Sequence, residues 1–229
     1  MLKKITNFFA YIISPPSCYQ CKRELEQRTI LCESCTKKIH PIATIPLKIT
    51  EKTYIPIFAA SDYHEPLKSL VLAKSWSNRT ASRDLGELIW KHTTIAYLNF
   101  DYIIPIPLHW TRYAARGYNQ AEEIARVISE KSGKPVVPIL SRHRKTPFQT
   151  KIKSEERFSN VKNSFSILKK VYDRENSETI LKNSFYYQKR ILIVDDVMTS
   201  GSTLIEATKT LLPLKPTQIF AVVACRASR

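Results

Sequence analysis

The sequence predicts an α/β domain with a mostly parallel sheet and flanking helices, preceded by a small module rich in cysteine. Two observations support this prediction. Segments typical of strands and helices alternate from about residue 54 onward, and four of the five cysteines lie within residues 18–35. Such alternation is typical of a parallel sheet with helices on both faces. The length of 229 residues suits one substantial domain with a small appendage, and we expect these to be residues 46–229 and 1–45.

The four N-terminal cysteines form two close pairs, Cys18 with Cys21 and Cys32 with Cys35. Two such pairs suit a tetrahedral zinc site, because each short turn offers two thiolates to one ion. A site closed by four sulfurs leaves no position for a substrate, so we expect structural zinc. Two disulfides are the alternative, although nothing else in the sequence indicates an oxidising compartment. Cys225 ends an apolar run and is expected to be a buried, inert thiol.

The segments that follow are assigned from their composition and period. Residues 41–56 contain three prolines and are interpreted as a linker, while residues 54–63 are β-rich and predict a strand. Helical periodicity predicts helices over 65–74 and 80–98. Their inward positions are expected to be Leu67, Leu70, Val71, Leu85, Leu88, Ile89 and Ala96.

The second half continues the alternation. The helix over 119–133 has the clearest signals, because Asn119 can cap it and Gly133 can end it. Its buried side is expected to consist of Ala121, Ile124, Ala125 and Ile128. Strands are predicted over 101–108, 136–140, 163–168, 190–197 and 219–226, and a helix over 203–212. The charged stretch 169–189 has no firm period and is interpreted as an insertion or a loosely ordered loop.

The net charge of +16 favours anionic partners, which include nucleic acid, a phosphorylated small molecule and an anionic membrane surface. No apolar run approaches the roughly 18 residues that a membrane-spanning helix needs. The first 17 residues hold two lysines and a short apolar stretch, which we interpret as packing on the main domain. An interfacial anchor is the alternative. We expect a cytoplasmic protein, with contact at the inner face of the membrane left open.

Two adjacent acids, Asp195 and Asp196, end the buried strand in the stretch ILIVDDVMTSGST, residues 191–203. Ligands of parallel sheets bind at the carboxyl ends of strands, and the amides that begin the next helix attract phosphate. The two carboxylates can accept hydrogen bonds from vicinal hydroxyls, so the pattern predicts a ribose 5-phosphate site. Mg²⁺ ligation is a second interpretation, and an ordinary capped helix is a third. Adjacent strand residues point to opposite faces, so both acids can act together only at a bent strand end.

The stretch 191–203 resembles the phosphoribosyl pyrophosphate (PRPP) motif of type I phosphoribosyltransferases. A second stretch, PIPLHWTRYAARGYNQAEEIA at residues 105–125, resembles the signature of the ComF family. The block RKTPFQTKIKSEERFSNVKNSF and the four-cysteine knuckle are similar to further parts of that family, so the resemblance covers most of the chain. It implies a type I phosphoribosyltransferase-like fold with an N-terminal zinc module.

The resemblance also implies roles for single residues. Asp195 and Asp196 would hold the ribose hydroxyls, and the loop would hold the 5-phosphate through Thr199, Ser200, Gly201, Ser202 and Thr203. Arg112 and Arg116 fall at the pyrophosphate position, where guanidinium groups can bond bidentately. The mobile catalytic loop of the fold would contain Arg142, Arg144, Lys145, Lys151 and Lys153. Arg144 and Lys145, with the two aspartates, are the expected catalytic residues, and Mg²⁺ would accompany PRPP in an active enzyme.

Aromatic residues lie among these cations. Trp76, Trp110, Tyr113 and Tyr118 have basic neighbours, and aromatic faces with interleaved cations suit unstacked bases on a phosphate chain. Core packing is the alternative for the tryptophans. The predicted nucleic-acid contacts are Trp110, Arg112, Tyr113, Arg116, Arg142, Arg144, Lys145, Lys151 and Lys153.

Three functions remain open at this point. The resemblance to the ComF family implies natural competence, with single-stranded DNA handled beside an ATP-driven helicase-like partner and a pocket that binds PRPP or another ribose phosphate. A working Mg²⁺-dependent phosphoribosyltransferase with an unknown nucleobase acceptor is the second hypothesis. A scaffold whose zinc module docks a partner is the third. The high positive charge favours the first.

Overall fold

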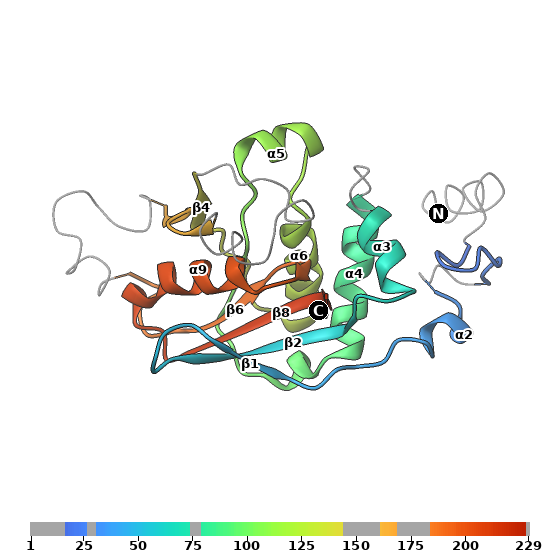
Figure 1. Ribbon diagram of the computed structural model, residues 1–229, viewed down its shortest axis with the longest axis horizontal. Coiled ribbons are helices and arrows are strands. Elements are labelled where there is room, and N and C mark those ends of the chain that lie inside the picture. Colours follow the sequence, from blue (N-terminus) through green and yellow to red (C-terminus); the bar gives the residue numbers. More distant parts are fainter. Residues whose placement is uncertain (1–16, 27–30, 74–78, 144–160, 169–183, 228–229) are drawn as a thin grey trace, which may run out of the picture.

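The computed structural model describes residues 17–26, 31–73, 79–143, 161–168 and 184–227 (Figure 1). Its main sheet has the strand order β1-β2-β8-β6-β3, and β7 also pairs with β8. The strands are β1 (Ile45–Lys48), β2 (Tyr54–Asp62), β3 (Tyr102–Pro105), β6 (Arg190–Val194), β7 (Val197–Met198) and β8 (Gln218–Arg226). All neighbours are parallel except β1 and β2, so the predicted mostly parallel sheet is confirmed.

Helices cover both faces of this sheet, as the alternation predicted. Along β6 the side chains alternate, because Ile191 and Ile193 join one buried cluster while Leu192 and Val194 join the other. The first cluster includes α9 (Ser202–Leu211). The second cluster includes α3 (Leu67–Ala73), α4 (Arg79–His92) and α6 (Gln120–Ser132). In Figure 1 the short helix α5 (Trp110–Arg116) projects from the body that these elements form.

The helix ends follow their predicted signals in two cases. Asn119 caps α6 by accepting a hydrogen bond from the Ala121 amide, and Gly133 ends the helix with a left-handed φ of 70°. The helix α9 ends at Leu211, and Pro213 lies in the following 3-10 turn, Leu212–Leu214. Ala121, Ile124, Ala125 and Ile128 are buried on α6, as expected.

The predicted helix over 80–98 is wrong at its C-terminal end. The helix α4 stops at His92, Thr93 adopts an extended backbone, and a 3-10 turn follows at Thr94–Tyr97. The amide and the hydroxyl of Thr93 both donate to the Ile89 carbonyl at the end of the helix, at 3.0 and 2.7 Å. The change of helical phase buries Ile95 and leaves Ala96 exposed.

The predicted proline linker over 41–56 is also wrong. Ile45–Lys48 forms the edge strand β1, which pairs antiparallel with the start of β2, and Pro46 lies opposite Pro56. Prolines are tolerated in edge strands and at strand starts, because the missing N–H need not donate to a ladder there. The edge strand covers β2 and places Leu47 near the loop that follows β6.

Two short strands form a separate sheet. β4 (Leu140–Arg142) pairs antiparallel with β5 (Phe165–Ile167). The strand predicted over 136–140 therefore differs from the structure, which has one parallel bridge between Val136 and Ile103 before β4 begins. Pro138 interrupts the ladder, because it has no N–H to donate.

The cysteine module packs on the main domain. Its short helix α2 (Glu33–Thr36) carries Cys35, which is buried. Cys18, Cys32 and Cys35 belong to the same buried cluster as α3, α4 and α6. The boundary at residue 45 stays a prediction.

Several predictions fall outside the described residues. They concern the membrane contact of residues 1–16, the aromatic role of Trp76, and the predicted insertion over 169–183. They also concern four cations of the expected catalytic loop, Arg144, Lys145, Lys151 and Lys153. Within the part of the chain that the structure describes, no helix has both the length and the hydropathy to cross a bilayer.

The starts of β3 and β6 are joined by an ion pair between Asp101 and Arg190. The Arg190 guanidinium donates to both carboxylate oxygens, at 2.8 and 3.2 Å, and its amide donates to the same group at 2.9 Å. These bonds from Arg190 lower the pKa of Asp101 to about 2. Because the pKa of Asp101 is lower in the folded chain, the ionised carboxylate stabilises the fold at pH values above its ordinary pKa of 3.8. This stabilisation is lost as the pH falls through about 2.

We therefore expect Asp101→Asn to lower the melting temperature at pH 7 by about 2–4 °C, which corresponds to about 1 kcal/mol for a partly exposed pair in a chain of this size. The difference between the variant and the wild type should shrink as the pH approaches 2. Thermal melts at a series of pH values measure this difference. A deficit that stays constant down to pH 2 would contradict the role of the ion pair.

Candidate ribose-phosphate site and cysteine cluster

The aspartate pair lies between β6 and β7, two strands that both pair with β8. Val194 pairs with Val222 and Val197 pairs with Cys225, so β6 and β7 keep the same offset against β8 on both sides of the interruption. Between them, Asp195 Oδ1 accepts from the Asp196 amide at 2.9 Å and Asp196 Oδ1 accepts from the Val197 amide at 2.6 Å. Each carboxylate thus satisfies the next backbone amide, and both side chains stay partly exposed at the carboxyl end of β6.

The hydroxyl-rich loop follows this pair directly. β7 ends at Met198, the loop runs through Thr199 and Ser200, and α9 begins at Ser202 after Gly201. A hollow of about 10 Å³ lies between Asp195 and this loop. Ser202 is buried and bonds with the Ser200 hydroxyl at 3.1 Å, while Thr199 and Thr203 are partly exposed at the hollow. The first residues of α9 and these hydroxyls therefore lie beside Asp195 at the hollow.

Gly201 is required by the backbone and by its neighbour. Its φ of 76° is left-handed, and a Cβ at this position would lie 2.9 Å from Leu47 Cδ1 of β1. Gly117 has the same φ of 76° but has nothing within 4 Å of the corresponding position. The two glycines therefore share the conformational requirement and differ in the contact.

Gly201→Ala should destabilise the fold by about 1–3 kcal/mol from backbone strain, with an additional loss from the contact with Leu47. Gly117→Ala is the matched control, because it carries the strain alone. Urea unfolding of both variants measures the difference. Equal losses would show that Leu47 moves aside without cost and that only the backbone requires glycine.

Two arginines interact electrostatically with the aspartates. The pKa of Arg142 falls to about 10 because of burial and then because of Arg112, while Asp195 acts in the opposite direction. Burial and then Arg116 lower the pKa of Arg112, and Asp196 opposes them. Arg142 also lies over the Phe165 ring, with 5.2 Å from the guanidinium carbon to the ring centroid. The end of β4 and the helix α5 thus bring positive charge to the two carboxylates, although they lie far apart in the sequence.

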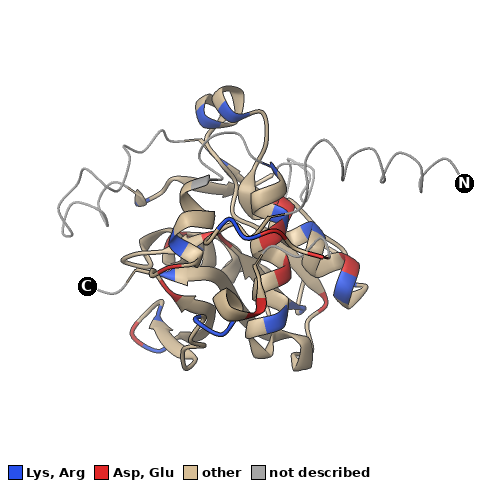
Figure 2. Cartoon of the chain, turned by 90° about the vertical axis from the view of Figure 1, so that its right-hand side faces the viewer, with Lys and Arg blue, Asp and Glu red and all other residues tan. Residues whose placement is uncertain are grey.

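Residues 106–119 include α5 and project from the domain. The two ends of this segment, at Ile106 and Asn119, are joined and are called the neck. Asn119 Nδ2 donates to the Ile106 carbonyl at 2.9 Å, which joins the two ends of residues 106–119. His109 caps α5, because its Nδ1 accepts from the Thr111 amide at 3.3 Å. The basic residues of α5 are Arg112 and Arg116, and α5 is the helix at the top of Figure 2, where Lys and Arg are blue. The neck therefore fixes the base of the helix that carries both predicted pyrophosphate contacts.

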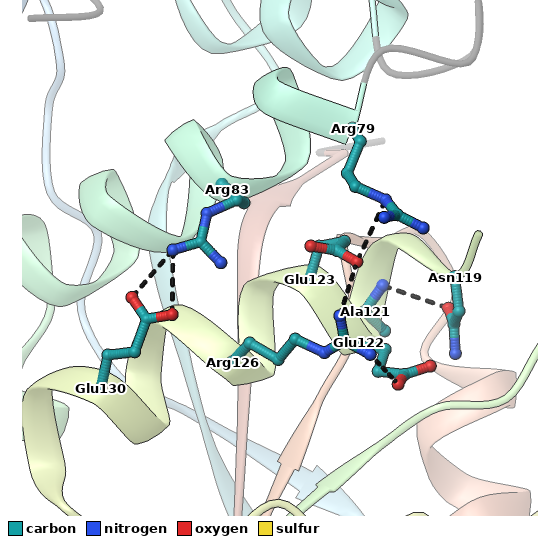
Figure 3. A network of polar contacts seen from close by, with 8 residues as sticks. All are labelled: Arg79, Arg83, Asn119, Ala121, Glu122, Glu123, Arg126 and Glu130. Carbon is teal, nitrogen blue, oxygen red and sulfur yellow. Dashed lines mark hydrogen bonds and ion pairs between the residues drawn. The ribbon is translucent and has the colours of Figure 1, made fainter. Parts of the chain in front are cut away.

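Ion pairs between α4 and α6 support this neck (Figure 3). Glu123 is 3% exposed and contacts both Arg79 and Arg126 at 3.3 Å. Arg79 also lies 5.6 Å from the centroid of the Tyr118 ring, and Tyr118 is 3% exposed. Tyr118 is therefore a buried support of the neck, and the interpretation of this ring as a surface for DNA bases is wrong.

The other predicted aromatic residues of this segment are accessible. Trp110 is 71% exposed and Tyr113 is 49% exposed, so neither belongs to the core. Both stand on the helix α5.

Tyr63 was not among the residues that the sequence predicted for the site. It directly follows β2, and its amide donates to the Arg226 carbonyl at 2.8 Å at the end of β8. Burial raises the pKa of Tyr63, and the charges of Cys225, Glu65 and Asp196 raise it further. The strand predicted over 54–63 ends at this residue, so the rule that ligands bind at carboxyl strand ends could have indicated it. Cys225 is completely buried, as expected.

The four N-terminal cysteines form one cluster. Their sulfur atoms lie within 4.8 Å of one another, and Cys21 Sγ is 3.7 Å from Cys32 Sγ. All four are free thiols, so the alternative of two disulfides is not supported. A regular tetrahedron with Zn–S bonds of about 2.3 Å has S–S edges of about 3.8 Å, which fits the observed separation.

The environment of the cluster also suits a metal. The Ser34 hydroxyl and then the Cys35 amide lower the pKa of Cys32 to about 6, while burial raises the pKa of Cys35 to about 12. The thiolate is the form that binds metal, and a bound cation would favour it at every cysteine. The four-cysteine cluster can therefore bind a metal ion such as zinc.

Known proteins resemble this chain in sequence and in fold. Residues 111–229 match the phosphoribosyl transferase domain. The chain is 30% identical to competence protein F of Haemophilus influenzae over 210 residues, which cover 89% of this chain and 81% of the relative. It is 27% identical to the DNA utilization protein YhgH of Salmonella typhimurium over 206 residues, which cover 85% and 83% of the two chains. The solved structure of the allosteric regulatory enzyme of purine biosynthesis aligns with a TM-score of 0.40 and 16% identity, over 63% of this chain and 25% of that one.

Proposed function

This chain belongs to the competence protein F and YhgH family and carries a phosphoribosyltransferase domain, and from this premise we propose that it handles incoming single-stranded DNA during natural transformation. In this proposal, a pocket of the PRPP type binds a ribose 5-phosphate group. The names of the two relatives, which refer to competence and to DNA utilization, support the part that concerns DNA.

The pocket is proposed from one arrangement, the aspartate pair followed by the hydroxyl-rich start of α9. Asp195 and Asp196 would accept hydrogen bonds from the two ribose hydroxyls. The α9 amides would hold the 5-phosphate, together with Thr199, Ser200, Gly201, Ser202 and Thr203. Arg112 and Arg116 would contact the pyrophosphate of PRPP, and Arg142 lies close enough to Asp195 to join them.

The DNA-binding surface is proposed from charge and exposed aromatic rings. The chain carries a net charge of +16, and α5 holds Arg112 and Arg116 beside the accessible rings of Trp110 and Tyr113. Phosphates would lie on the arginines, and bases would stack on the rings. The basic residues Arg142, Arg144, Lys145, Lys151 and Lys153 would extend this surface. An ATP-driven helicase-like protein, the partner implied by the family resemblance, would deliver the strand.

Salt dependence of DNA binding tests this proposal. Between about 50 and 200 mM salt, the affinity for a single-stranded oligonucleotide should fall on the order of tenfold or more, because at least three phosphates would release counterions. Arg112→Ala with Arg116→Ala should reduce the slope of log K against log salt by about 1.4, which is about 0.7 for each lost phosphate contact. Lys52→Ala is the matched control, because Lys52 is exposed in the turn before β2, at the opposite edge of the sheet. An affinity that does not change with salt would exclude this mode of binding.

A working phosphoribosyltransferase is the second candidate, and the two arginines beside the carboxylates favour it. Mg²⁺ bound with PRPP would neutralise charge on the leaving pyrophosphate. Arg112 and Arg142 would orient that group, and the aspartates would hold the ribose. Arg144 and Lys145 would be further catalytic residues, while the zinc would be structural. Pyrophosphate release from PRPP in a screen of nucleobases tests this candidate, and a protein that binds PRPP without releasing pyrophosphate would contradict it.

A further inference from the structure

A second pocket, with a volume of about 400 Å³, lies between α5, the start of α6 and β4. Pockets that hold small organic groups have volumes on the order of 300–1,000 Å³, so the volume suits a ring system. Most of the wall is apolar or aromatic, formed by Pro105, Pro107, Leu108, Trp110, Tyr113 and Leu140. Such a wall favours a flat, neutral group over a hydrated anion.

The helix α5 presents different residues to its two sides. At about 100° per residue, Trp110 and Tyr113 point about 60° apart around α5 and Arg112 and Arg116 about 40° apart, and the mean directions of the two pairs differ by about 110°. The aromatic side lines the pocket, and Arg112 on the arginine side is close enough to Asp196 for their charges to interact. The pocket and the proposed ribose-phosphate site therefore lie on neighbouring sides of the same helix.

Arg142 links these two places. Its side chain lines the pocket, and its charge also interacts with Arg112 and Asp195. A phosphate on Arg142 would thus lie at the boundary between an apolar cavity for a ring and the carboxylates of the proposed ribose site. A nucleic-acid strand has this sequence of groups, because each apolar ring is joined through a sugar to an anionic phosphate.

Among the described residues that line the pocket, Glu122 is the one carboxylate, and it indicates what kind of ring would fit. Glu122 is partly buried, and its Oε1 accepts from Arg126 Nη2 at 2.7 Å. A carboxylate has about four acceptor positions, so this bond leaves capacity for a further donor. It would repel a free phosphate or pyrophosphate, whereas it can accept from the amino group of cytosine. Thymine has a carbonyl oxygen at the same position, which would face the carboxylate unfavourably.

We infer that the pocket between α5 and β4 holds one unstacked base of the single strand, prefers cytosine to thymine through Glu122, and directs the adjoining phosphate to Arg142. This inference rests on the proposed function, because it requires that the protein binds single-stranded DNA. It adds a base-binding position that is separate from the aspartate site.

The test compares three oligonucleotides of about 16 nucleotides, which is the upper range of a single binding module. These are oligo-dC, oligo-dT and an abasic chain with the same number of phosphates, each measured with the full chain by fluorescence anisotropy. We expect oligo-dC to bind severalfold more tightly than oligo-dT. The abasic chain should bind on the order of tenfold more weakly than oligo-dC, since loss of stacking typically costs this much or more for each base.

Three variants identify the pocket. Trp110→Ala should reduce oligo-dC affinity on the order of tenfold and leave abasic binding unchanged. Glu122→Gln should remove the difference between oligo-dC and oligo-dT. Tyr97→Ala is the matched control, because Tyr97 is 89% exposed and lies before the amino end of β3, whereas Pro105 of the pocket lies at the carboxyl end of that strand. It should bind like the wild type, and thermal melts of all variants report whether they are folded.

The outcomes separate this inference from the proposed function. If none of the three chains binds, the proposed function fails. If all three bind equally and Trp110→Ala has no effect, DNA binding stands but the base-binding pocket does not, and an apolar peptide becomes the occupant to test. If Trp110→Ala weakens binding while Glu122→Gln leaves the cytosine preference intact, the ring position stands and the role of Glu122 is wrong.

Discussion

Asp195→Asn combined with Asp196→Asn is expected to weaken the binding of Mg·PRPP on the order of 100-fold or more. Two charge-assisted hydrogen bonds to the ribose would be replaced by neutral ones, and each charged bond contributes about 1.5–3 kcal/mol. The fold should be unaffected, because asparagine also has an Oδ1 that accepts hydrogen bonds. At position 195 it can accept from the amide of residue 196, and at position 196 it can accept from the Val197 amide. Isothermal titration calorimetry with Mg·PRPP measures the loss, and a thermal melt confirms that the variant is folded.

A matched control removes one acid elsewhere. Glu51 is exposed in the turn between β1 and β2, at the edge of the sheet opposite to the aspartates. Glu51→Gln should therefore bind PRPP as tightly as the wild type. If the double aspartate variant also binds normally, the ribose is held elsewhere and the proposed pocket is wrong. DNA affinity measured on the same variant shows whether the two ligands share the site.

Loss of the metal from the cysteine cluster is expected to have the largest effect on stability. Cys21 is the exposed member of the cluster, so Cys21→Ser changes no buried packing of that side chain. The variant should still lose the metal and several kcal/mol of stability, which corresponds to about 10 °C or more, because the binding energy of a structural zinc is also folding energy. Cys18, Cys32 and Cys35 belong to the buried cluster that includes α3, so the loss should spread to the main domain.

Elemental analysis and thermal melts test this expectation together. The wild type should contain one zinc ion per chain, and a chelator should lower its melting temperature to that of Cys21→Ser. Cys225→Ala is the control, because this fifth cysteine is buried in β8 and should leave the metal content unchanged. A wild-type chain without metal, or a Cys21→Ser variant as stable as the wild type, would contradict a structural zinc.

Local signals predicted several elements correctly. The Asn119 cap and the Gly133 stop define α6, because both act through the backbone of neighbouring residues. The alternating burial of β6 follows from the apolar run that precedes Asp195, and the cysteine spacing predicted a compact cluster. These features depend on residues within one turn or one strand of each other, and their physical causes are local.

The errors have a common cause, which is that partners distant in the chain override local preference. Pro46 and Pro56 indicated a linker, yet edge pairing with β2 makes this segment a strand. Ala96 was expected inside, but α4 ends at His92 and the new phase buries Ile95. Tyr118 was grouped with the aromatic residues suited to stack on bases, but it is buried, and Arg79 of α4 lies over its ring.

The residues Asp195 and Asp196, the loop up to Thr203 and the four cysteines could be recognised in the sequence, because adjacent or closely spaced side chains define each of these sites. The electrostatic interactions of Arg112 and Arg142 with the aspartates could not, nor could that of Tyr63 with Asp196. The pocket between α5 and β4 is likewise formed by segments about 30 residues apart, whose approach depends on the closed neck at Asn119. Spacing along the chain indicates which groups are available, whereas folding brings distant charges together and determines which of them share a site.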